Sequence, residues 1–232
     1  MKQTTPLPSA LLARFRSNLD LKLLLMLTLP LVTAGAYFAV QRMILFPTRS
    51  LPITWLDRAT PFQPAWVWAY LSLYLLNPVG PLLTRSREDL LWYTRGILFL
   101  FAFGIVFFVL LPVAGPRPSA YEGNWLYNRL VHIDRVYNSF PSLHAGCAVY
   151  AVLYAAYASG DTSRRKLRKV LLACAWVWVC LILYSTIATR QHFAIDLLPG
   201  ILLAWLARTL FFERHPERTR CKRGVLVGGE SA

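Results

Sequence analysis

Two histidines, His144 and His192, stand where polar loop segments meet apolar stretches, and their neighbours could support phosphoryl chemistry. His144 ends the stretch PSLH, residues 141–144. Proline breaks a preceding helix and Ser142 is a preferred N-cap type, so we expect a helix to begin here with His144 in its first turn. The unpaired N–H groups and the positive dipole end of such a helix form a ready phosphate site. Ser142 adds a hydroxyl to that site, and His144 adds a proton source.

His192 is followed four residues later by Asp196. On a helix the two side chains share one face, so the carboxylate can hold the proton of one ring nitrogen. The other nitrogen is then free to act as a nucleophile. Asp196 would lie about one turn inside the membrane, where a carboxylate needs a partner, and His192 is the obvious one. This pair predicts a catalytic histidine rather than a histidine that only anchors the surface.

Two arginines accompany the histidines. Arg117 lies in the loop that leads to PSLH, and Arg190 precedes His192 by two residues. Guanidinium groups bind phosphate oxygens in bidentate fashion and stay charged, so both are candidate phosphate ligands. The sequence has no set of clustered carboxylates that suggests a metal site, and we expect chemistry without a metal ion or a cofactor.

The elements that must position these residues are membrane helices. Hydrophobic residues make up 56% of the 232 residues and charged residues only 16%, whereas soluble domains carry about 25% charged residues. Six apolar blocks are each close to the roughly 20 residues that cross a bilayer as a helix. They span residues 23–40, 66–83, 96–113, 144–159, 170–188 and 194–212. The sequence therefore predicts an all-α fold, a bundle of six transmembrane helices over residues 23–212.

Charge sets the expected orientation of this bundle. The net charge is +14, and with a cytoplasmic N-terminus 18 of the 25 basic residues fall on the cytoplasmic side. This asymmetry obeys the positive-inside rule and predicts that both termini, a segment 1–22 and a basic tail 213–232, are cytoplasmic. The basic runs then contact anionic headgroups rather than nucleic acid. The loops 114–141 and 189–196 both fall on the outer face, which brings the polar residues to one end of the bundle.

The block 23–40 has a second interpretation, a signal peptide. Five spans would then remain, with the termini on opposite sides of the membrane. The block lies well in from the start of the chain and no convincing small-residue cleavage site follows it, so an uncleaved helix is favoured.

The same stretches resemble the type 2 phosphatidic acid phosphatase superfamily of membrane lipid phosphatases and phosphotransferases. That family carries the motifs K-x6-RP, PSGH and SR-x5-H-x3-D. The matching stretches are Arg117 with Pro118, PSLH at 141–144 and STIATRQHFAID at 185–196. The resemblance covers roughly residues 45–210.

Three positions depart from the family motifs. Leu110 replaces the lysine, Leu143 replaces the glycine of PSGH, and Thr186 replaces an arginine whose charge Arg190 is the candidate to supply. PSLH with a basic residue two positions before the second histidine is similar to inositol phosphorylceramide synthases and related bacterial enzymes.

The resemblance implies a two-step mechanism. His192 would attack phosphorus and form a phosphohistidine, Asp196 would orient its ring, and His144 would protonate the leaving group and then activate water or an alcohol. The phosphoryl oxygens would be held by Arg117, Arg190, Ser142 and the backbone amides of Leu143 and His144.

The expected function is hydrolysis of a lipid phosphate or pyrophosphate, such as phosphatidic acid or a polyprenyl pyrophosphate. The expected place is the periplasmic face of a bacterial inner membrane, or the lumenal side in a eukaryotic cell. Two alternatives stay open: a phosphotransferase that moves a phospho-headgroup onto an alcohol, and a lipid-binding membrane protein that kept the fold without the chemistry. The expected partners are a lipid phosphate and the bilayer, and the sequence leaves the oligomeric state open.

Overall fold

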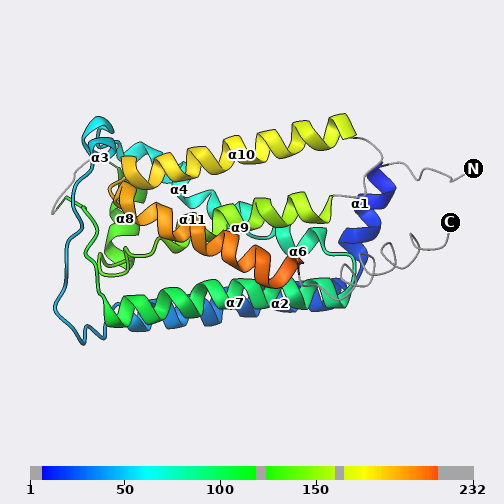
Figure 1. Ribbon diagram of the computed structural model, residues 1–232, viewed down its shortest axis with the longest axis horizontal. Helices are drawn as coiled ribbons and strands as arrows, with labels where there is room; N and C mark the ends of the chain where they lie inside the picture. The colour runs from blue at the N-terminus through cyan, green and yellow to red at the C-terminus, as the bar shows by residue number, and fades with distance from the viewer. Residues whose placement is uncertain (1–6, 119–123, 160–164, 214–232) are drawn as a thin grey trace, which may run out of the picture.

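Long apolar helices set the length of the molecule. The computed structural model describes residues 7–118, 124–159 and 165–213. Helices α2 (Leu19–Val40), α7 (Arg87–Leu110) and α10 (Arg165–Ala188) run along its long axis together with α11 (Ala194–Arg208), which continues into the π-helical η2 (Thr209–Glu213) (Figure 1). Within the described residues, four helices are long and apolar enough to cross a membrane, and they contain four of the six predicted blocks almost completely.

The second predicted block, residues 66–83, is a chain of short helical pieces rather than one helix. The pieces are η1 (Pro64–Trp66), α4 (Val67–Leu71), α5 (Leu73–Leu76) and α6 (Val79–Leu83). Pro78 and Pro81 cannot donate the backbone hydrogen bonds of a continuous helix, which explains the break between α5 and α6. The fourth predicted block, residues 144–159, forms α9 (Leu143–Ala158), a helix of 16 residues. The all-helical prediction is confirmed, and these two blocks form shorter helices than expected.

Helix α9 is the centre of the bundle. It packs against α5, α6, α7, α10 and α11. Every side chain from Leu143 to Tyr154 is buried, so this helix has no face of its own toward the surroundings over three turns. A helix buried on all sides must be apolar on all sides, and the sequence LHAGCAVYAVLY meets that requirement except at His144.

Glycines bring α9 and α11 into backbone contact. A Cβ atom added at Gly200 would lie 2.2 Å from the carbonyl oxygen of Ser142, and one added at Gly146 would lie 3.2 Å from the carbonyl oxygen of Gly200. Small residues allow membrane helices to approach this closely. The approach lets the backbone N–H of Ser142 donate to the carbonyl oxygen of Asp196, at 3.1 Å. The crossing therefore fixes the start of α9 against the start of α11.

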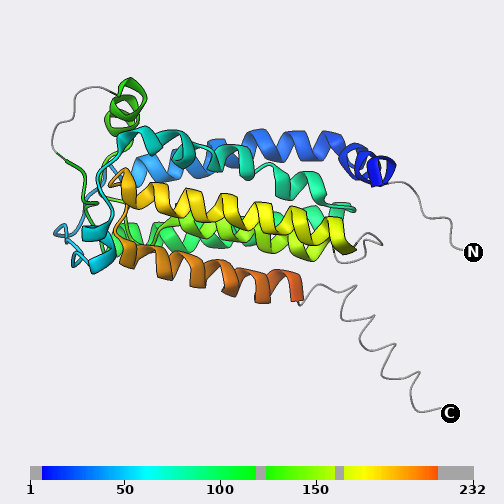
Figure 2. The ribbon, with the colours of Figure 1, turned by 90° about the horizontal axis from the view of Figure 1, so that it is seen from above.

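The irregular segments gather at one end of the bundle, here called the loop end. It contains α3 (Trp55–Ala59), α8 (Trp125–Ile133) and the loops at 111–118, 134–142 and 189–193, and Figures 1 and 2 show it opposite the end that carries α1 (Leu7–Arg16). Isolated parallel bridges join Val113 to Arg49 and to Asn138, so three loops are tied together there. Helices α9 and α11 both begin at the loop end, with their unpaired N–H groups directed toward it.

The opposite end is held by a buried lysine. Lys22 is fully buried, and its ammonium group donates to the carbonyl oxygens of Arg14 at 2.6 Å and Thr84 at 3.0 Å. These carbonyls lie near the ends of α1 and α6, where a positive charge is favourable. Lys22 therefore joins α1, α2 and α6.

The outward faces of the long helices carry large apolar side chains. Leu27, Leu31 and Val32 of α2 are each 65% exposed, and α7, α10 and α11 present further leucines and valines. Exposed apolar surface of this extent is typical of a surface that contacts lipid. Residues 214–232, most of the predicted basic tail, lie outside the described residues.

Candidate active site

His144 and His192 face one another at the loop end. His144 lies in the first turn of α9, and His192 lies in the loop just before α11. Their ring centroids are 6.5 Å apart and both side chains are buried. One phosphoryl group between the rings could contact both, because each hydrogen bond or attack distance is about 3 Å.

The surroundings of His192 distinguish its two ring nitrogens. Nδ1 lies 3.1 Å from the carbonyl oxygen of Ser139 and 3.3 Å from Oδ1 of Asp196. Both of these atoms can only accept, so Nδ1 carries the hydrogen. Nε2 then carries the lone pair, and no described residue forms a hydrogen bond to it. This is the arrangement that a nucleophilic histidine requires.

Asp196 is fully buried and its carboxylate is held by more than His192. Its Oδ2 accepts from the hydroxyl of Ser139 at 2.6 Å and from the backbone N–H of Phe193 at 3.0 Å. The two hydrogen bonds to Oδ2 and the contact of Oδ1 with His192 fix the direction of the carboxylate at the start of α11, where the helix dipole also favours a negative group. Ser139 therefore contacts both members of the pair, a role that the sequence did not reveal.

His144 is held by Tyr70 of α4. Its Nε2 lies 2.8 Å from the carbonyl oxygen of Tyr70, and the two rings stack with centroids 3.8 Å apart. A carbonyl oxygen only accepts, so Nε2 carries a hydrogen and Nδ1 is the ring atom that can take up or release a proton. The tautomer of His144 is thus set by α4.

The start of α9 presents free backbone donors. Ser142 is the N-cap, as predicted, and its hydroxyl oxygen accepts from the N–H of Ala145 at 3.2 Å. No described residue accepts a hydrogen bond from the N–H groups of Leu143 and His144. These two amides are the donors expected for an anion at a helix N-terminus. The Ser142 hydroxyl caps the helix, and the Leu143 side chain packs against Gly104 of α7.

Arg117 forms an ion pair with Asp134 next to the histidines. One guanidinium nitrogen lies 3.0 Å from Oδ2 of Asp134, and another donates to the Asp134 backbone carbonyl. The other carboxylate oxygen of Asp134 accepts from the hydroxyl of Tyr37 and the amide of Gln41, both on the α2 side. The Nε group of Arg117 is buried and has no hydrogen-bond partner in the described part of the chain. The pairing of Arg117 with Asp134 was not predicted from the sequence.

Arg190 is held away from the histidine rings by the α3 loop. Its guanidinium donates to the carbonyl oxygens of Asp57 at 2.8 Å and Thr60 at 2.9 Å, and its backbone is left-handed, with φ 54°. In this state the group supports the loop that carries His192. Direct contact with a phosphate would need a change of rotamer.

Asp57 connects α3 to the start of α11. Its Oδ1 accepts from the backbone N–H of Ala194 at 2.8 Å, and its Oδ2 caps α3 through Thr54. The carboxylate is 2% exposed, so a residue 137 positions away in the chain caps the catalytic helix. No pattern in the sequence around Asp57 predicts this contact.

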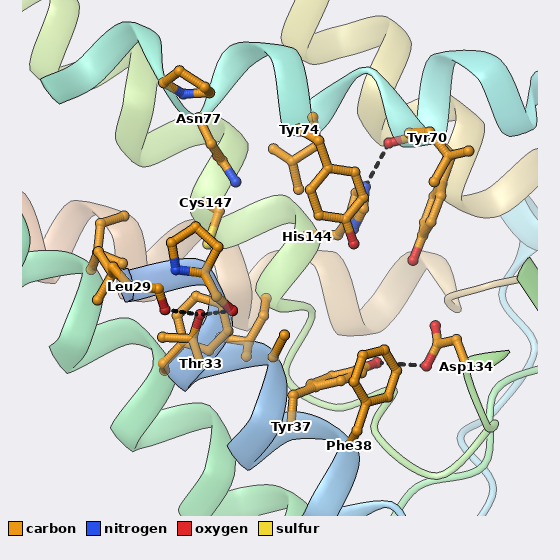
Figure 3. A pocket seen from close by; sticks show the side chains of 18 of the residues that line it. Leu29, Thr33, Tyr37, Phe38, Tyr70, Tyr74, Asn77, Asp134, His144 and Cys147 are labelled. Atoms are coloured by element: carbon orange, nitrogen blue, oxygen red, sulfur yellow. Dashed lines mark hydrogen bonds between the residues drawn. The ribbon is translucent and has the colours of Figure 1, made fainter. Parts of the chain in front are cut away.

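A cavity of about 600 Å³ extends from the histidines into the bundle. His144, His192, Asp134 and Asn138 line it at the loop end, and the walls come from α2, α4 to α7 and α8 (Figure 3). On α2 the lining residues run from Leu25 to Phe38, which corresponds to about 20 Å along the helix. The volume is typical of a small-molecule site, and most of the lining is apolar.

No group of three or more His, Cys, Asp or Glu side chains that could hold a metal ion occurs among the described residues.

The model of the PAP2 superfamily matches residues 35–210 of the chain. The chain belongs to the PAP2 superfamily. Comparisons with curated proteins and with solved structures found no match.

Membership in the PAP2 superfamily indicates the general type of reaction that the site supports. PAP2 proteins are typically metal-independent phosphatases, and membership suggests a lipid phosphatase or phosphotransferase. Together with its four long apolar helices, the match identifies the chain as an integral membrane protein. The expected family resemblance is therefore confirmed.

Proposed function

We propose that this PAP2 protein is a lipid phosphatase that hydrolyses a lipid phosphate or pyrophosphate through a phosphohistidine on His192. The observation that carries this proposal is the pair of histidine rings 6.5 Å apart at the head of a long, mostly apolar cavity. A lipid tail in the cavity would leave its phosphoryl group between the two rings. Phosphatidic acid and polyprenyl pyrophosphate are the two classes of substrate considered.

In the first step the Nε2 lone pair of His192 attacks phosphorus. An N–P bond forms, the P–O bond to the lipid breaks, and the leaving oxygen takes a proton from His144. In the second step His144 removes a proton from water, whose oxygen attacks phosphorus and releases phosphate from His192. Asp196 stabilises the positive charge on the ring in the intermediate. The amides of Leu143 and His144, Nε of Arg117 and, after a rotamer change, Arg190 are the proposed ligands of the phosphoryl oxygens.

The proposed topology is six spans with both termini in the cytoplasm. It counts the broken segment 66–83 and the short α9 as spans, because both pack against longer helices, which can satisfy free backbone groups. The loop end then faces the periplasm of a bacterium, or the lumen in a eukaryotic cell. The catalytic groups would lie at the outer membrane–water interface.

The proposal is tested by phosphate release from the purified protein in detergent, with EDTA present. Phosphatidic acid, polyprenyl pyrophosphate and phosphatidylglycerol phosphate are compared. We expect release from at least one of them, and no release by the His192→Ala variant. Equal release by the variant would exclude the phosphohistidine, and loss of activity in EDTA would exclude the metal-free mechanism.

The ion pair of Arg117 and Asp134 favours a second candidate function, transfer of a phospho-headgroup to an alcohol. Asp134 offsets the charge of Arg117, and Leu110 and Thr186 stand where the family motifs have cations. A site with less positive charge is better matched to a phosphodiester, which carries one negative charge, than to a doubly charged monoester. Incubation with a phospholipid donor and an acceptor alcohol tests this function, since a transferase yields a new lipid without free phosphate.

A non-catalytic lipid-binding protein is the remaining candidate. It predicts that His192→Ala retains lipid binding and every cellular function of the parent chain. The phosphate-release and transfer assays therefore separate the three candidates.

A further inference from the structure

Among the described residues that line the cavity, the side-chain amide of Asn77 forms no hydrogen bond, whereas Asn138, at the loop end, leaves its Oδ1 unpaired and donates from its amide nitrogen to Tyr37. Thr33 and Thr94 also line it, but their hydroxyls donate to Leu29 and Leu90 of their own helices, each at 2.8 Å. Asn77 has no such bond within the described chain: its Oδ1 is buried without a partner. Figure 3 shows the side chain extending from the α5 side with its nitrogen directed toward Cys147 across the cavity.

An unpaired amide in a mostly apolar cavity is costly, and a structural role does not account for it. Asn77 is the C-cap residue of α5, and its backbone N–H already donates to Leu73 at 2.9 Å. The helical break that follows belongs to Pro78. The amide nitrogen forms no hydrogen bond to a described residue and, unlike the buried Oδ1, is directed into the cavity, so its N–H groups are available to an acceptor that enters there.

The position of Asn77 along the cavity says which part of a lipid would meet it. Tyr70, whose carbonyl binds His144, is seven residues earlier on the same helical segment, or about 10 Å away along the helix axis. Cys147, toward which the amide points, is one turn beyond His144 on α9, about 5 Å deeper. Asn77 therefore lies at the depth of the lipid atoms that directly follow the phosphoryl group, and far from the ends of the lipid chains.

We propose that the Asn77 amide donates a hydrogen bond to an acyl carbonyl of the lipid backbone, so that the cavity selects acylated lipids over polyprenyl lipids. Glycerolipids and N-acyl lipids carry an ester or amide carbonyl a few bonds from the phosphoryl oxygen. A polyprenyl chain has only hydrocarbon at that depth and would leave the amide unpaired. This inference rests on the proposed function for the placement of the phosphoryl group, and it names the substrate class of that same site.

The sharpest probe changes the lipid rather than the protein. Diacyl phosphatidic acid and its dialkyl-ether analogue differ only in the two carbonyl groups. We expect the unsubstituted protein to prefer the diacyl lipid by about tenfold in kcat/KM, and Asn77→Leu to remove the preference, because the leucine side chain cannot donate. Thr33→Val is the matched control, since its hydroxyl is already bonded within α2, and it should keep the tenfold preference.

The same comparison can be made without turnover. In the His192→Ala background, the rise in unfolding temperature on adding each lipid reports binding alone. Diacyl lipid should stabilise the protein more than the ether analogue, and Asn77→Leu should make the two equal. Equal effects of the two lipids on the protein that retains Asn77, or a preference that survives Asn77→Leu, would overturn the proposal. Absence of phosphate release from every substrate would instead count against the proposed phosphatase, and binding would still decide the role of Asn77.

Discussion

Ser139 contacts both His192 and Asp196, through two different atoms. Its carbonyl oxygen accepts from Nδ1 of His192, and its hydroxyl donates to Asp196 at 2.6 Å. Removing the hydroxyl leaves the first contact in place and takes away one of the two bonds to Oδ2 of the carboxylate. The carboxylate is then free to rotate away from the imidazole ring.

We predict that Ser139→Ala lowers kcat roughly 10- to 100-fold with little change in KM, because a hydrogen bond to a charged group contributes about 1.5–3 kcal/mol. Steady-state phosphate release measures both constants. Ser50→Ala, an exposed serine at the same end, is the control and should leave both constants unchanged. A rise in KM at constant kcat would show that Ser139 acts on lipid binding and not on the pair.

Single residues also show where sequence reasoning reaches its limit. His192 and Asp196 are four residues apart and lie in contact, as predicted, although His192 belongs to the loop before α11 and not to the helix itself. The partners Ser139 and Asp57 reach Asp196 and Ala194 across 57 and 137 positions, and such contacts depend on how loops from different helices pack. Arg190 illustrates the same point, because its spacing from His192 was visible while its bonds to the α3 loop were not.

Among the elements, α3 holds the loop before α11 in place through hydrogen bonds. It supplies the Asp57 carboxylate to Ala194 and two carbonyl oxygens to Arg190, and Gln63 beyond it donates to Ala188 at 2.8 Å. Loss of the Asp57 carboxylate removes the bond to Ala194 at the start of α11 and the bonds to Thr54 at the start of α3. We predict that Asp57→Ala lowers the free energy of unfolding by about 1–3 kcal/mol and lowers kcat as well.

Asp57→Asn separates the two effects, because its amide oxygen can still accept from Ala194. It should recover most of the activity, and Asp20→Ala, an exposed aspartate in the first turn of α2, should behave as the unsubstituted chain. Thermal unfolding in detergent and phosphate release are measured on all three variants. Full activity of Asp57→Ala would show that the contacts of α3 with the loop before α11 are not needed for activity.

The crossing of α9 and α11 is the second element on which the site depends. A methyl group at Gly200 would lie 2.2 Å from the carbonyl oxygen of Ser142, so the two helices would have to separate where the histidines are held. We predict that Gly200→Ala lowers the free energy of unfolding by about 1–3 kcal/mol and reduces activity more than stability, although it changes no group that touches substrate. Gly35→Ala is a close control, since a Cβ atom there meets nothing within 4 Å.

The sequence predicted the long helices well and the broken segment 66–83 poorly, for physical reasons. Hydropathy located α2, α7, α10 and α11, because a long apolar helix satisfies its own backbone and leaves a clear pattern. It did not separate 66–83 into short pieces, since Pro78 and Pro81 are compatible with either a kink or a break. The burial of Lys22 could not be predicted for a related reason: its carbonyl partners are Arg14 of α1 and Thr84, which the pattern of α2 cannot reveal.

At the scale of the whole molecule, the charge asymmetry and the position of the site make one joint prediction. The loop end, which holds Ser50 and both histidines, should lie outside the cytoplasm, and the chain end that follows α11 should lie inside. Cys221, in the basic tail, is a natural probe of that end. Cys174 and Cys180 lie within α10 and Cys147 within α9, where a polar reagent does not reach thiols surrounded by lipid or protein.

We predict that a membrane-impermeant maleimide leaves the unsubstituted protein unlabelled in intact cells and labels it at Cys221 once the membrane is opened. Ser50→Cys should be labelled in intact cells, because residue 50 is exposed at the loop end. The physical reason is the cost of moving the 18 basic residues of the opposite side across the membrane. Labelling of Cys221 in intact cells, together with protection of Ser50→Cys, would reverse the topology and place the phosphoryl chemistry on the cytoplasmic face.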